Sequence, residues 1–193
     1  MEQEINDKFF DIKIVHDKFQ AAVHEDDDVQ LLLYLESFEE LNKFVTLMGT
    51  MFGFVSKDLK AKIDILNEFV RDDNMSENFI TVKTMIEYEK QNDLLNKKGH
   101  TSGSRTLLRL HRGLDFIQLF LKKLGDLKNE EATSIACRDA YDQTLAKHHP
   151  FVCGEIENIQ QAMDLLPKTL EATSNVHNRI ENLYTLHDIH MLP

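Results

Sequence analysis

The stretch from Ser102 to Leu124 constrains the fold more than any other part of the chain. Its apolar residues recur at helical spacing and no proline interrupts it, so we expect one long α-helix. The middle of the stretch is too apolar for a surface helix. The stretch is also too short and too charged to cross a membrane. It is therefore predicted to be the central helix of the fold.

Three arginines lie inside this helix at i, i+4 and i+7. With about 100° of rotation per residue, they fall within an arc of roughly 60° on one face. The arginines are Arg105, Arg109 and Arg112, and the same arc continues through Phe116, Leu119 and Phe120. One face of the helix thus begins with cations and ends with hydrocarbon. Such a face suits a ligand with an anionic head and an apolar tail.

A second polar face lies beside the arginines on the same helix. It consists of His111, Asp115, Gln118 and Lys122, and we expect it to be the solvent face. The arginine arc is then predicted to point further inward, where charges are costly unless they are paired. Because guanidinium groups suit bidentate contacts with phosphate, an anionic ligand is favoured. The alternative stays open that the arginines are surface residues paired with the chain's many carboxylates.

The rest of the chain is also predicted to be helical. Only 7 glycines and 3 prolines occur in 193 residues, too few for a sheet protein with many turns. Apolar periodicity predicts helices at 5–24, from 29 or 37 to 69, and at 76–96, 102–124, 130–148, 151–166 and 168–188. Polar turns are expected at 24–28, 71–74 and 96–104, and Ser102 or Ser104 can cap the central helix. We expect one all-α domain spanning 1–193, with its helices in two packed layers.

Composition narrows the possible functions. The net charge of −11 argues against a nucleic-acid binder and against a broad electrostatic hold on an anionic membrane. The two cysteines lack the spacing of a disulfide framework, which favours a reducing intracellular compartment. The first residues lack the basic start and apolar run of a signal peptide. We therefore expect a soluble, cytoplasmic protein.

Motifs for catalysis are missing from the sequence. There is no HExxH pattern, nucleophile elbow, P-loop or glycine-rich dinucleotide fingerprint. The pair His148-His149 lacks the spacing of metal ligands. We expect no catalytic residues, no metal and no cofactor. An enzyme that acts on a lipid phosphate is the alternative, and release of inorganic phosphate would reveal it.

Two other places carry chemistry. Asp58 and Lys62 interrupt an otherwise apolar stripe and have the i, i+4 spacing of an ion pair within one helix. They form either a partly exposed intrahelical pair or a wall opposite the arginines. His149 stands just before Pro150, where a helix is expected to end. Its imidazole either interacts favourably with the negative C-terminal end of the helix dipole or donates a hydrogen bond into a cleft.

Three motifs resemble those of one protein family. The segment SGSRTLLRLHRGLDFI at 102–117 resembles the central helix of the glycolipid transfer protein superfamily. The segment FGFVSKDLKAK at 52–62 is similar to that family's second-helix motif, and His149-Pro150-Phe151 to its His-Pro-aromatic turn. All three occur in the family's order and at similar separations. The resemblance implies an all-α, two-layer helical sandwich of about eight helices, which carries a lipid between membranes without turnover.

The resemblance also indicates the headgroup. Family members that bind sugar headgroups place a tryptophan where this chain has Arg109, and this chain has no tryptophan at all. Lys62 stands where the sugar binders carry an amide. In both respects this chain is similar to the branch of the family that transfers ceramide-1-phosphate. The alternatives are a sphingolipid sensor or adaptor, and transfer of a neutral glycosphingolipid or an inositol phosphoceramide.

Carried over position by position, the resemblance implies a role for each site residue. The phosphate headgroup would be bound by Lys62, Arg105, Arg109 and Arg112. Asp58 would accept from the sphingoid amide, and His149 would donate to the acyl carbonyl. The hydrophobic pocket would comprise Phe44, Phe52, Phe54, Phe116, Phe120 and Val152. Phe151 would touch the membrane during a transient peripheral contact, and the protein is expected to act as a monomer.

Overall fold

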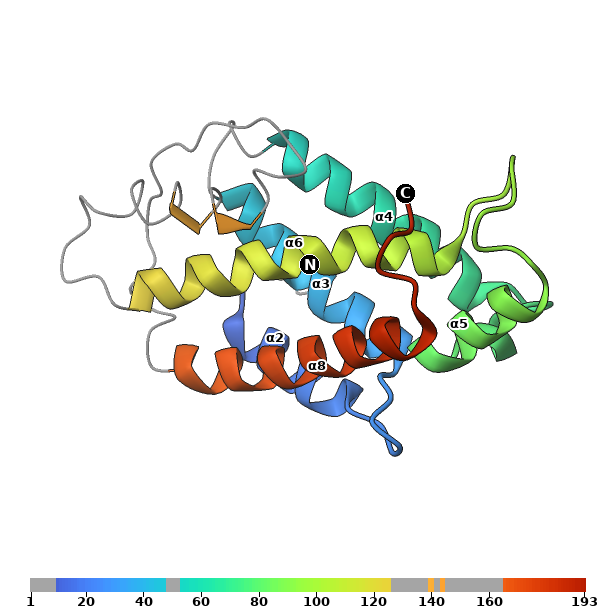
Figure 1. The fold of residues 1–193 in the computed structure, drawn as a ribbon. Coiled ribbons are helices and arrows are strands. Elements are labelled where there is room, and N and C mark those ends of the chain that lie inside the picture. Colours follow the sequence, from blue (N-terminus) through green and yellow to red (C-terminus); the bar gives the residue numbers. More distant parts are fainter. Residues whose placement is uncertain (1–9, 48–52, 126–138, 141–142, 145–164) are drawn as a thin grey trace.

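Figure 1 shows the fold, which is known from a computed structural model and is described for residues 10–47, 53–125, 139–140, 143–144 and 165–193. Within these ranges the structure has six α-helices, one short 3-10 helix and no β-strand, which confirms the all-α prediction. The elements are α2 (Ile12–Ala22), α3 (Leu31–Leu47), α4 (Gly53–Arg71), η2 (Ser76–Phe79), α5 (Val82–Gln91), α6 (Gly103–Gly125) and α8 (Leu166–His187).

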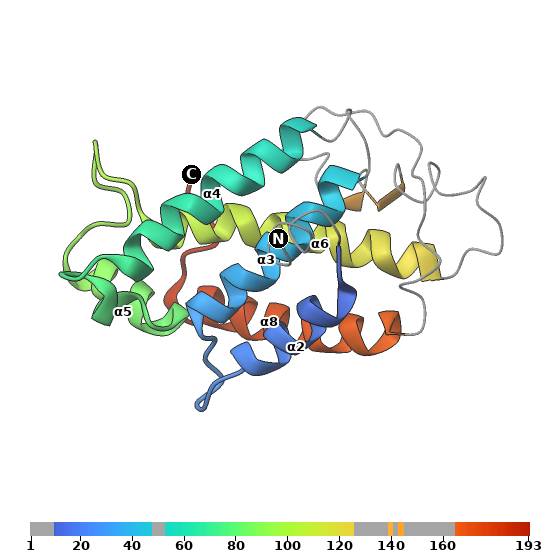
Figure 2. The ribbon, with the colours of Figure 1, turned by 180° about the vertical axis from the view of Figure 1, so that it is seen from behind.

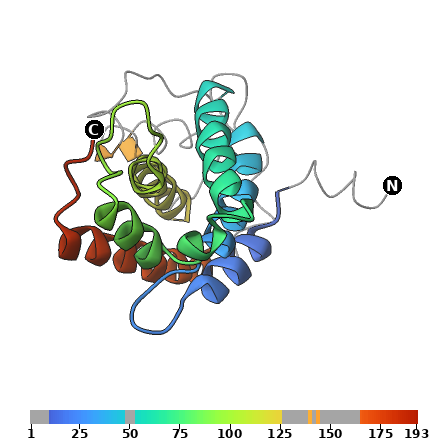
Figure 3. The same ribbon diagram turned by 90° about the vertical axis from the view of Figure 1, so that its right-hand side faces the viewer.

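The long helices surround one apolar core. Helix α6 packs against α4 on one side and α8 on the other, while α2 packs against both α3 and α8. Helix α3 also packs against α4, so these five helices close a ring. Figures 1 and 2 show α4 and α6 above, α2 and α8 below, and α3 running obliquely between them. Figure 3 shows the same ring from one end, with α6 nearly end-on.

Helices α3 and α4 correct the prediction of a single helix reaching residue 69. The Asn67 side-chain amide donates to the Glu39 carboxylate over 2.9 Å, and the hydroxyls of Thr46 and Ser56 lie 2.9 Å apart. A continuous helix would hold residues 39 and 67 about 42 Å apart along its axis. The chain therefore folds back between α3 and α4. Apolar periodicity runs through both helices because each buries one face against the core, and this hides the boundary.

The predicted ends of other helices shift for identifiable reasons. The helix expected at 76–96 is split, because η2 comes first and Thr81 then caps α5 through a reciprocal bond with Thr84. Pro167 lies in the first turn of α8 rather than between two helices, where its fixed φ suits a helix start. Asp11 caps α2. The helices expected at 130–148 and 151–166 fall largely outside the described residues.

The acidic turn at 24–28 is present and has a structural role. Asp26 and Asp27 have φ angles of 55° and 57°, in the left-handed region where a tight turn places them. Asp28 is buried, and its carboxylate accepts from the main-chain N–H groups of Val29 and Lys83. The turn thereby fixes the start of α5. None of the described helices is long and apolar enough to cross a membrane.

Candidate functional site

The start of α6 is fixed by a buried carboxylate from α5. Ser102 Oγ accepts from the main-chain N–H of Arg105 over 3.1 Å, so Ser102 is the cap. Glu89, which is fully buried, accepts from Ser102 Oγ at 2.7 Å and from the N–H groups of Gly103 at 2.6 Å and Ser104 at 2.9 Å. The negative charge of the Glu89 carboxylate interacts favourably with the positive, N-terminal end of the α6 dipole. Sequence reasoning missed Glu89, because nothing local connects residue 89 to residue 103.

The three arginines lie along the outer side of α6, and each donates to a main-chain oxygen. Arg105 donates to His100 over 2.8 Å, Arg109 to Pro193 over 2.9 Å, and Arg112 to His190 over 3.1 Å. Arg109 is exposed, and the other two are half-buried. The prediction that this arc points inward is therefore wrong. The arginines border the surface, where a ligand in solution or in a membrane can reach them.

The partners of these arginines differ from what a strongly acidic chain would suggest. Within the described ranges, none of Arg105, Arg109 and Arg112 forms an ion pair with an aspartate or glutamate side chain. Arg179, in contrast, lies 3.7 Å from the Asp27 carboxylate. A guanidinium has five N–H donors, and a single main-chain oxygen occupies one of them. The positive charge of this face is thus not offset by any described carboxylate side chain.

Asp58 and Lys62 form the intrahelical ion pair that their spacing allows. The Lys62 side chain is only 13% exposed, whereas that of Asp58 is 49% exposed. Both lie on α4 beside Leu59, whose Cδ2 would be 3.4 Å from a Cβ at Gly113 of α6. The missing side chain of Gly113 lets the two helices approach closely there. Lys62 and Asp58 therefore belong to the helix that packs directly against the arginine-bearing helix.

The apolar end of the predicted face is buried where its residues are described. Phe116 and Phe120 stack with ring centroids 5.9 Å apart, and Phe44 of α3 lies 6.2 Å from Phe120. All three side chains belong to the core. Phe54 differs, because it is 48% exposed on α4. The other predicted contacts, Phe52, His149, Phe151 and Val152, lie outside the described residues.

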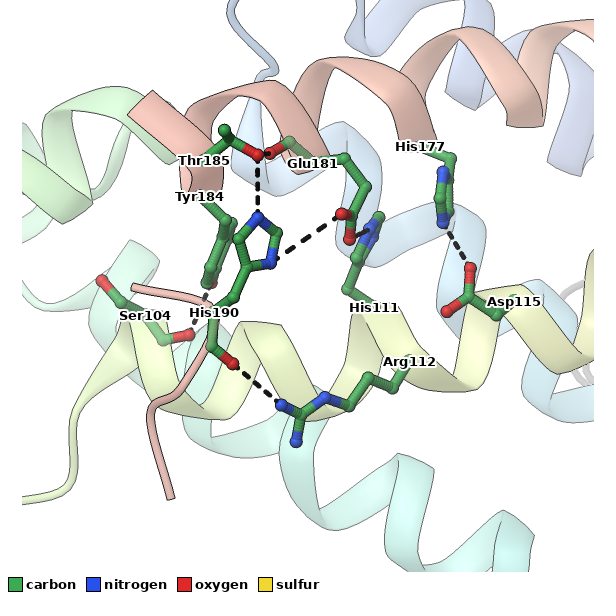
Figure 4. A network of polar contacts seen from close by, with 9 residues as sticks. All are labelled: Ser104, His111, Arg112, Asp115, His177, Glu181, Tyr184, Thr185 and His190. Atoms are coloured by element: carbon green, nitrogen blue, oxygen red, sulfur yellow. Dashed lines mark hydrogen bonds and ion pairs between the residues drawn. The ribbon is translucent and has the colours of Figure 1, made fainter. Parts of the chain in front are cut away.

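The second polar face of α6 meets α8 at His111 and Asp115, which corrects the prediction of a solvent face for these two residues, whereas Lys122 is exposed as predicted. His111 is buried, and its Nε2 lies 3.0 Å from a carboxylate oxygen of Glu181. Its ring stacks on that of His177 with centroids 4.3 Å apart, and His177 in turn pairs with Asp115 (Figure 4). Asp115 also lines a groove of about 450 Å³ between the two helices. Which face a neighbouring helix covers could not be read from α6 alone.

Burial and hydrogen bonding shift the pKa values of the ionisable side chains at the interface between α6 and α8. Burial lowers the pKa of His111, and the hydrogen bond to Glu181 offsets this only in part. That same bond lowers the pKa of Glu181. Burial opposes charge on His177, but the hydrogen bond and the charge of Asp115 outweigh it, so the pKa of His177 is raised. At neutral pH this favours a neutral His111 that donates from Nε2 to the Glu181 carboxylate.

The same side chains are the described residues that come nearest to a metal site. The donor atoms of His111, His177 and Glu181 lie within 4.8 Å of one another. Two imidazoles and a carboxylate are a ligand set that Zn²⁺ accepts. However, each of the three already has a hydrogen-bonding partner, in His111–Glu181 and His177–Asp115. We interpret these side chains as a polar contact that links α6 to α8.

The C-terminal segment, defined here as residues 188–193, crosses the outer side of α6 (Figure 1). It leaves α8 at Asp188, whose φ of 55° turns the chain back. Ile189 and Leu192 are buried against the core, whereas Met191 is 93% exposed. This segment supplies the main-chain oxygens that accept from Arg109 and Arg112, a contribution that no motif in the sequence reveals.

Comparison with known proteins is consistent with this fold. The sequence pattern of the glycolipid transfer protein (GLTP) family matches residues 29–178. The ceramide-1-phosphate transfer protein of Danio rerio is 33% identical, over 95% of this chain and 98% of the relative. The crystal structure of the mouse ceramide-1-phosphate transfer protein in its apo form superimposes with a TM-score of 0.86 at 30% identity, covering 96% of this chain and all of that one.

A ligand-bound structure is also similar. The human ceramide-1-phosphate transfer protein in complex with 2:0 ceramide-1-phosphate superimposes with a TM-score of 0.82 at 29% identity, over 95% of this chain and 99% of that one. The family pattern covers most of the chain, and the similarity to the zebrafish relative extends over nearly its whole length. The helices found here, with α6 between α4 and α8, are arranged as in these proteins. The chain therefore belongs to the glycolipid transfer protein family.

Proposed function

We propose that this protein binds a sphingolipid with a phosphate headgroup, ceramide-1-phosphate, and carries it between membranes without chemical turnover. It would act as a single domain over 1–193, as a monomer, in the cytoplasm, with transient contacts to membrane surfaces. The zebrafish relative is named for transfer of this lipid, and a similar human protein has been crystallised with it. These likenesses support the proposal, and the chemistry of this chain's own residues gives it specific content.

One observation carries the proposal: none of the three arginines on one face of α6 pairs with a described aspartate or glutamate side chain, in a chain of net charge −11. With 33 acidic residues against 22 basic ones, an ordinary surface would pair such arginines with carboxylates. A phosphate monoester supplies the missing negative charge, and one guanidinium group can donate two parallel hydrogen bonds to two of its oxygens. A sugar headgroup would leave these cations unmatched.

We assign Arg105, Arg109, Arg112 and Lys62 to the phosphate. Arg109 is proposed as the discriminating residue of the four, because it is the most exposed of the three arginines. By the resemblance described above, it would also take the place of the tryptophan of sugar-binding family members. Lys62 comes from α4, which packs against α6 near Gly113. When Lys62 turns to the phosphate, Asp58 would be released to accept from the sphingoid amide. His149 would donate to the acyl carbonyl.

The two hydrocarbon tails would enter the apolar end of the same helix. Phe44, Phe116 and Phe120 contribute to that region, and Phe52, Phe54 and Val152 are proposed to complete the pocket. Each CH₂ group transferred from water to an apolar pocket contributes about 0.8 kcal/mol. A transfer protein must bury most of both tails to compete with a bilayer, so the headgroup decides which lipid is carried. Phe151 is proposed to touch the membrane.

Native mass spectrometry of lipid that co-purifies with the protein tests this proposal. We expect a ceramide-1-phosphate, and we expect the purified protein to move it between vesicles. A co-purified neutral glycosphingolipid would contradict the assignment. Tight binding without vesicle-to-vesicle transfer would indicate a sensor instead. Release of inorganic phosphate from the bound lipid would overturn the non-enzymatic part of the proposal.

A further inference from the structure

The C-terminal segment is held to α8 by its own side chains. His190 Nε2 lies 2.9 Å from the hydroxyl of Thr185, and His190 Nδ1 lies 3.8 Å from the carboxylate of Glu181 (Figure 4). Ile189 and Leu192, on either side of His190, are buried in the core. The segment is therefore anchored by both polar and apolar contacts.

From this anchored position the segment presents main-chain oxygens to α6. Figure 4 shows the His190 carbonyl meeting the guanidinium of Arg112, with a donor–acceptor distance of 3.1 Å. The oxygen of Pro193 accepts from Arg109 at 2.9 Å. A chain of contacts thus runs from Thr185 and Glu181 on α8, through His190, to the cationic face on α6.

We infer that the C-terminal segment positions Arg109 and Arg112 for the headgroup phosphate, with His190 as the principal positioning residue. This inference rests on the function proposed above. An arginine side chain has several rotatable bonds, and ordering it on binding reduces affinity. A hydrogen bond to a fixed main-chain oxygen restricts the guanidinium before the ligand arrives. The phosphate then meets donors that are already oriented.

The contacts favour positioning over blocking. Each guanidinium gives one N–H to the segment and keeps four others, which is enough for a bidentate phosphate contact. The His190 carbonyl is uncharged, so it restricts Arg112 without neutralising it. If the segment instead competed with the headgroup, releasing it would strengthen binding. The two interpretations therefore predict opposite signs.

The test compares His190→Ala with the neighbouring variant Met191→Ala in the full-length chain. The probes are ceramide-1-phosphate and ceramide with identical tails, each offered in phosphatidylcholine vesicles. We expect His190→Ala to weaken binding of ceramide-1-phosphate about three- to tenfold and to leave ceramide binding unchanged. Met191→Ala, which alters a side chain that is 93% exposed, should match the wild type. A double variant, His190→Ala with Leu192→Ser, should enlarge the loss for the phosphorylated lipid only.

A second readout follows the arginines directly. NMR relaxation of the side-chain Nε–H group of Arg112 in the lipid-free protein should show increased motion in His190→Ala. A change in global stability alone would alter neither this signal nor the ratio of the two affinities. If the double variant fails to fold, as judged by thermal unfolding, His190→Ala and Thr185→Val decide the question.

The outcomes separate this inference from the proposed function. If the wild type binds ceramide-1-phosphate no better than ceramide, the proposed function is wrong. If the wild type discriminates and His190→Ala does so equally well, with an unchanged Arg112 signal, only the positioning role is overturned. Tighter binding of ceramide-1-phosphate by His190→Ala would also overturn it, and would identify the segment as a competitor of the headgroup.

Discussion

Two polar faces lie side by side on α6, and they are partnered in opposite ways. On one face, His111 and Asp115 pair with ionisable side chains of α8, namely Glu181 and His177. On the other face, the arginines donate to main-chain oxygens. The ionisable groups of His111 and Asp115 on the first face are paired within the protein, although the buried Nδ1 of His111 and Nε2 of Gln118 have no partner among the described residues. The second retains donors and charge that the described part of the chain does not use.

This difference distinguishes polar side chains that stabilise the fold from polar side chains that are available to bind a ligand. A buried polar pair stabilises a fold when both partners are present, because neither is left without a hydrogen bond. A set of cations that lacks carboxylate partners gains from a ligand of opposite charge. The sequence places both sets on one helix, and only their partners distinguish them. The variants below test the two sides of this comparison.

The largest expected effect comes from the structural face. His111→Ala removes a buried ring that contacts His177 and Glu181, and we expect a loss of roughly 2–4 kcal/mol in the free energy of unfolding. Chemical denaturation measures this loss. Below the unfolding transition, the variant should still prefer ceramide-1-phosphate over ceramide. A stable His111→Ala protein that loses this preference would reverse the roles assigned to the two faces.

Arg109→Leu tests the binding face. A hydrogen bond to a charged group contributes about 1.5–3 kcal/mol, so we expect transfer of ceramide-1-phosphate to fall at least tenfold. The midpoint of thermal unfolding should stay close to that of the wild type. Lys122→Leu is the matched control, since it removes one positive charge from the other polar face of α6. Equal losses in the two variants would mean that net charge, rather than Arg109, governs transfer.

Lys62→Met should have a smaller effect on binding than Arg109→Leu. The charge of Lys62 is already shared with Asp58, and that ion pair must rearrange before Lys62 reaches a phosphate. We expect the dissociation constant for ceramide-1-phosphate to rise about fivefold, or on the order of 1 kcal/mol. Lys60→Met offers the control, because Lys60 forms a similar i, i+4 pair with Asp64 that is exposed on both sides. Binding should distinguish the two lysines.

The smallest effect concerns pH. The raised pKa of His177 lets the folded protein take up a proton before the unfolded chain, so stability should rise as the pH falls towards the ordinary value of 6.5. Below 6.5 the unfolded chain protonates at position 111 while the folded protein resists, so stability should fall. His187, whose pKa is lowered by burial and then by Lys90, adds to that fall.

Thermal unfolding between pH 5 and 8 checks this pattern. We expect the unfolding free energy to have a shallow maximum near pH 6.5. His177→Gln should remove the rise on the alkaline side. His111→Gln should reduce the fall on the acidic side. A flat profile in the wild type would contradict the pairing described for the structural face.

The sequence predicts features that depend on local spacing. The limits of α6 lie within a residue of those expected, Ser102 is its cap, and Asp58 pairs with Lys62. Each of these depends on residues one or two helical turns apart. Local rules suffice for such contacts.

Features that depend on distant residues were missed or reversed. The return of the chain between α3 and α4 is set by packing, since the apolar pattern is continuous through both helices. The burial of His111 depends on α8, and the cap from Glu89 depends on α5. The oxygens that accept hydrogen bonds from Arg109 and Arg112 belong to the main chain, so residue identity does not predict them.

The central claim is that the arginine face of α6 selects a phosphate headgroup. Transfer between vesicles, measured for ceramide-1-phosphate and for galactosylceramide with identical tails, tests it most directly. The pocket then contributes equally to both lipids, and only the headgroup differs. We predict that the wild-type protein transfers ceramide-1-phosphate at least tenfold faster, because the sugar leaves the arginines and Lys62 without an anion. Equal rates, or faster transfer of galactosylceramide, would contradict the account.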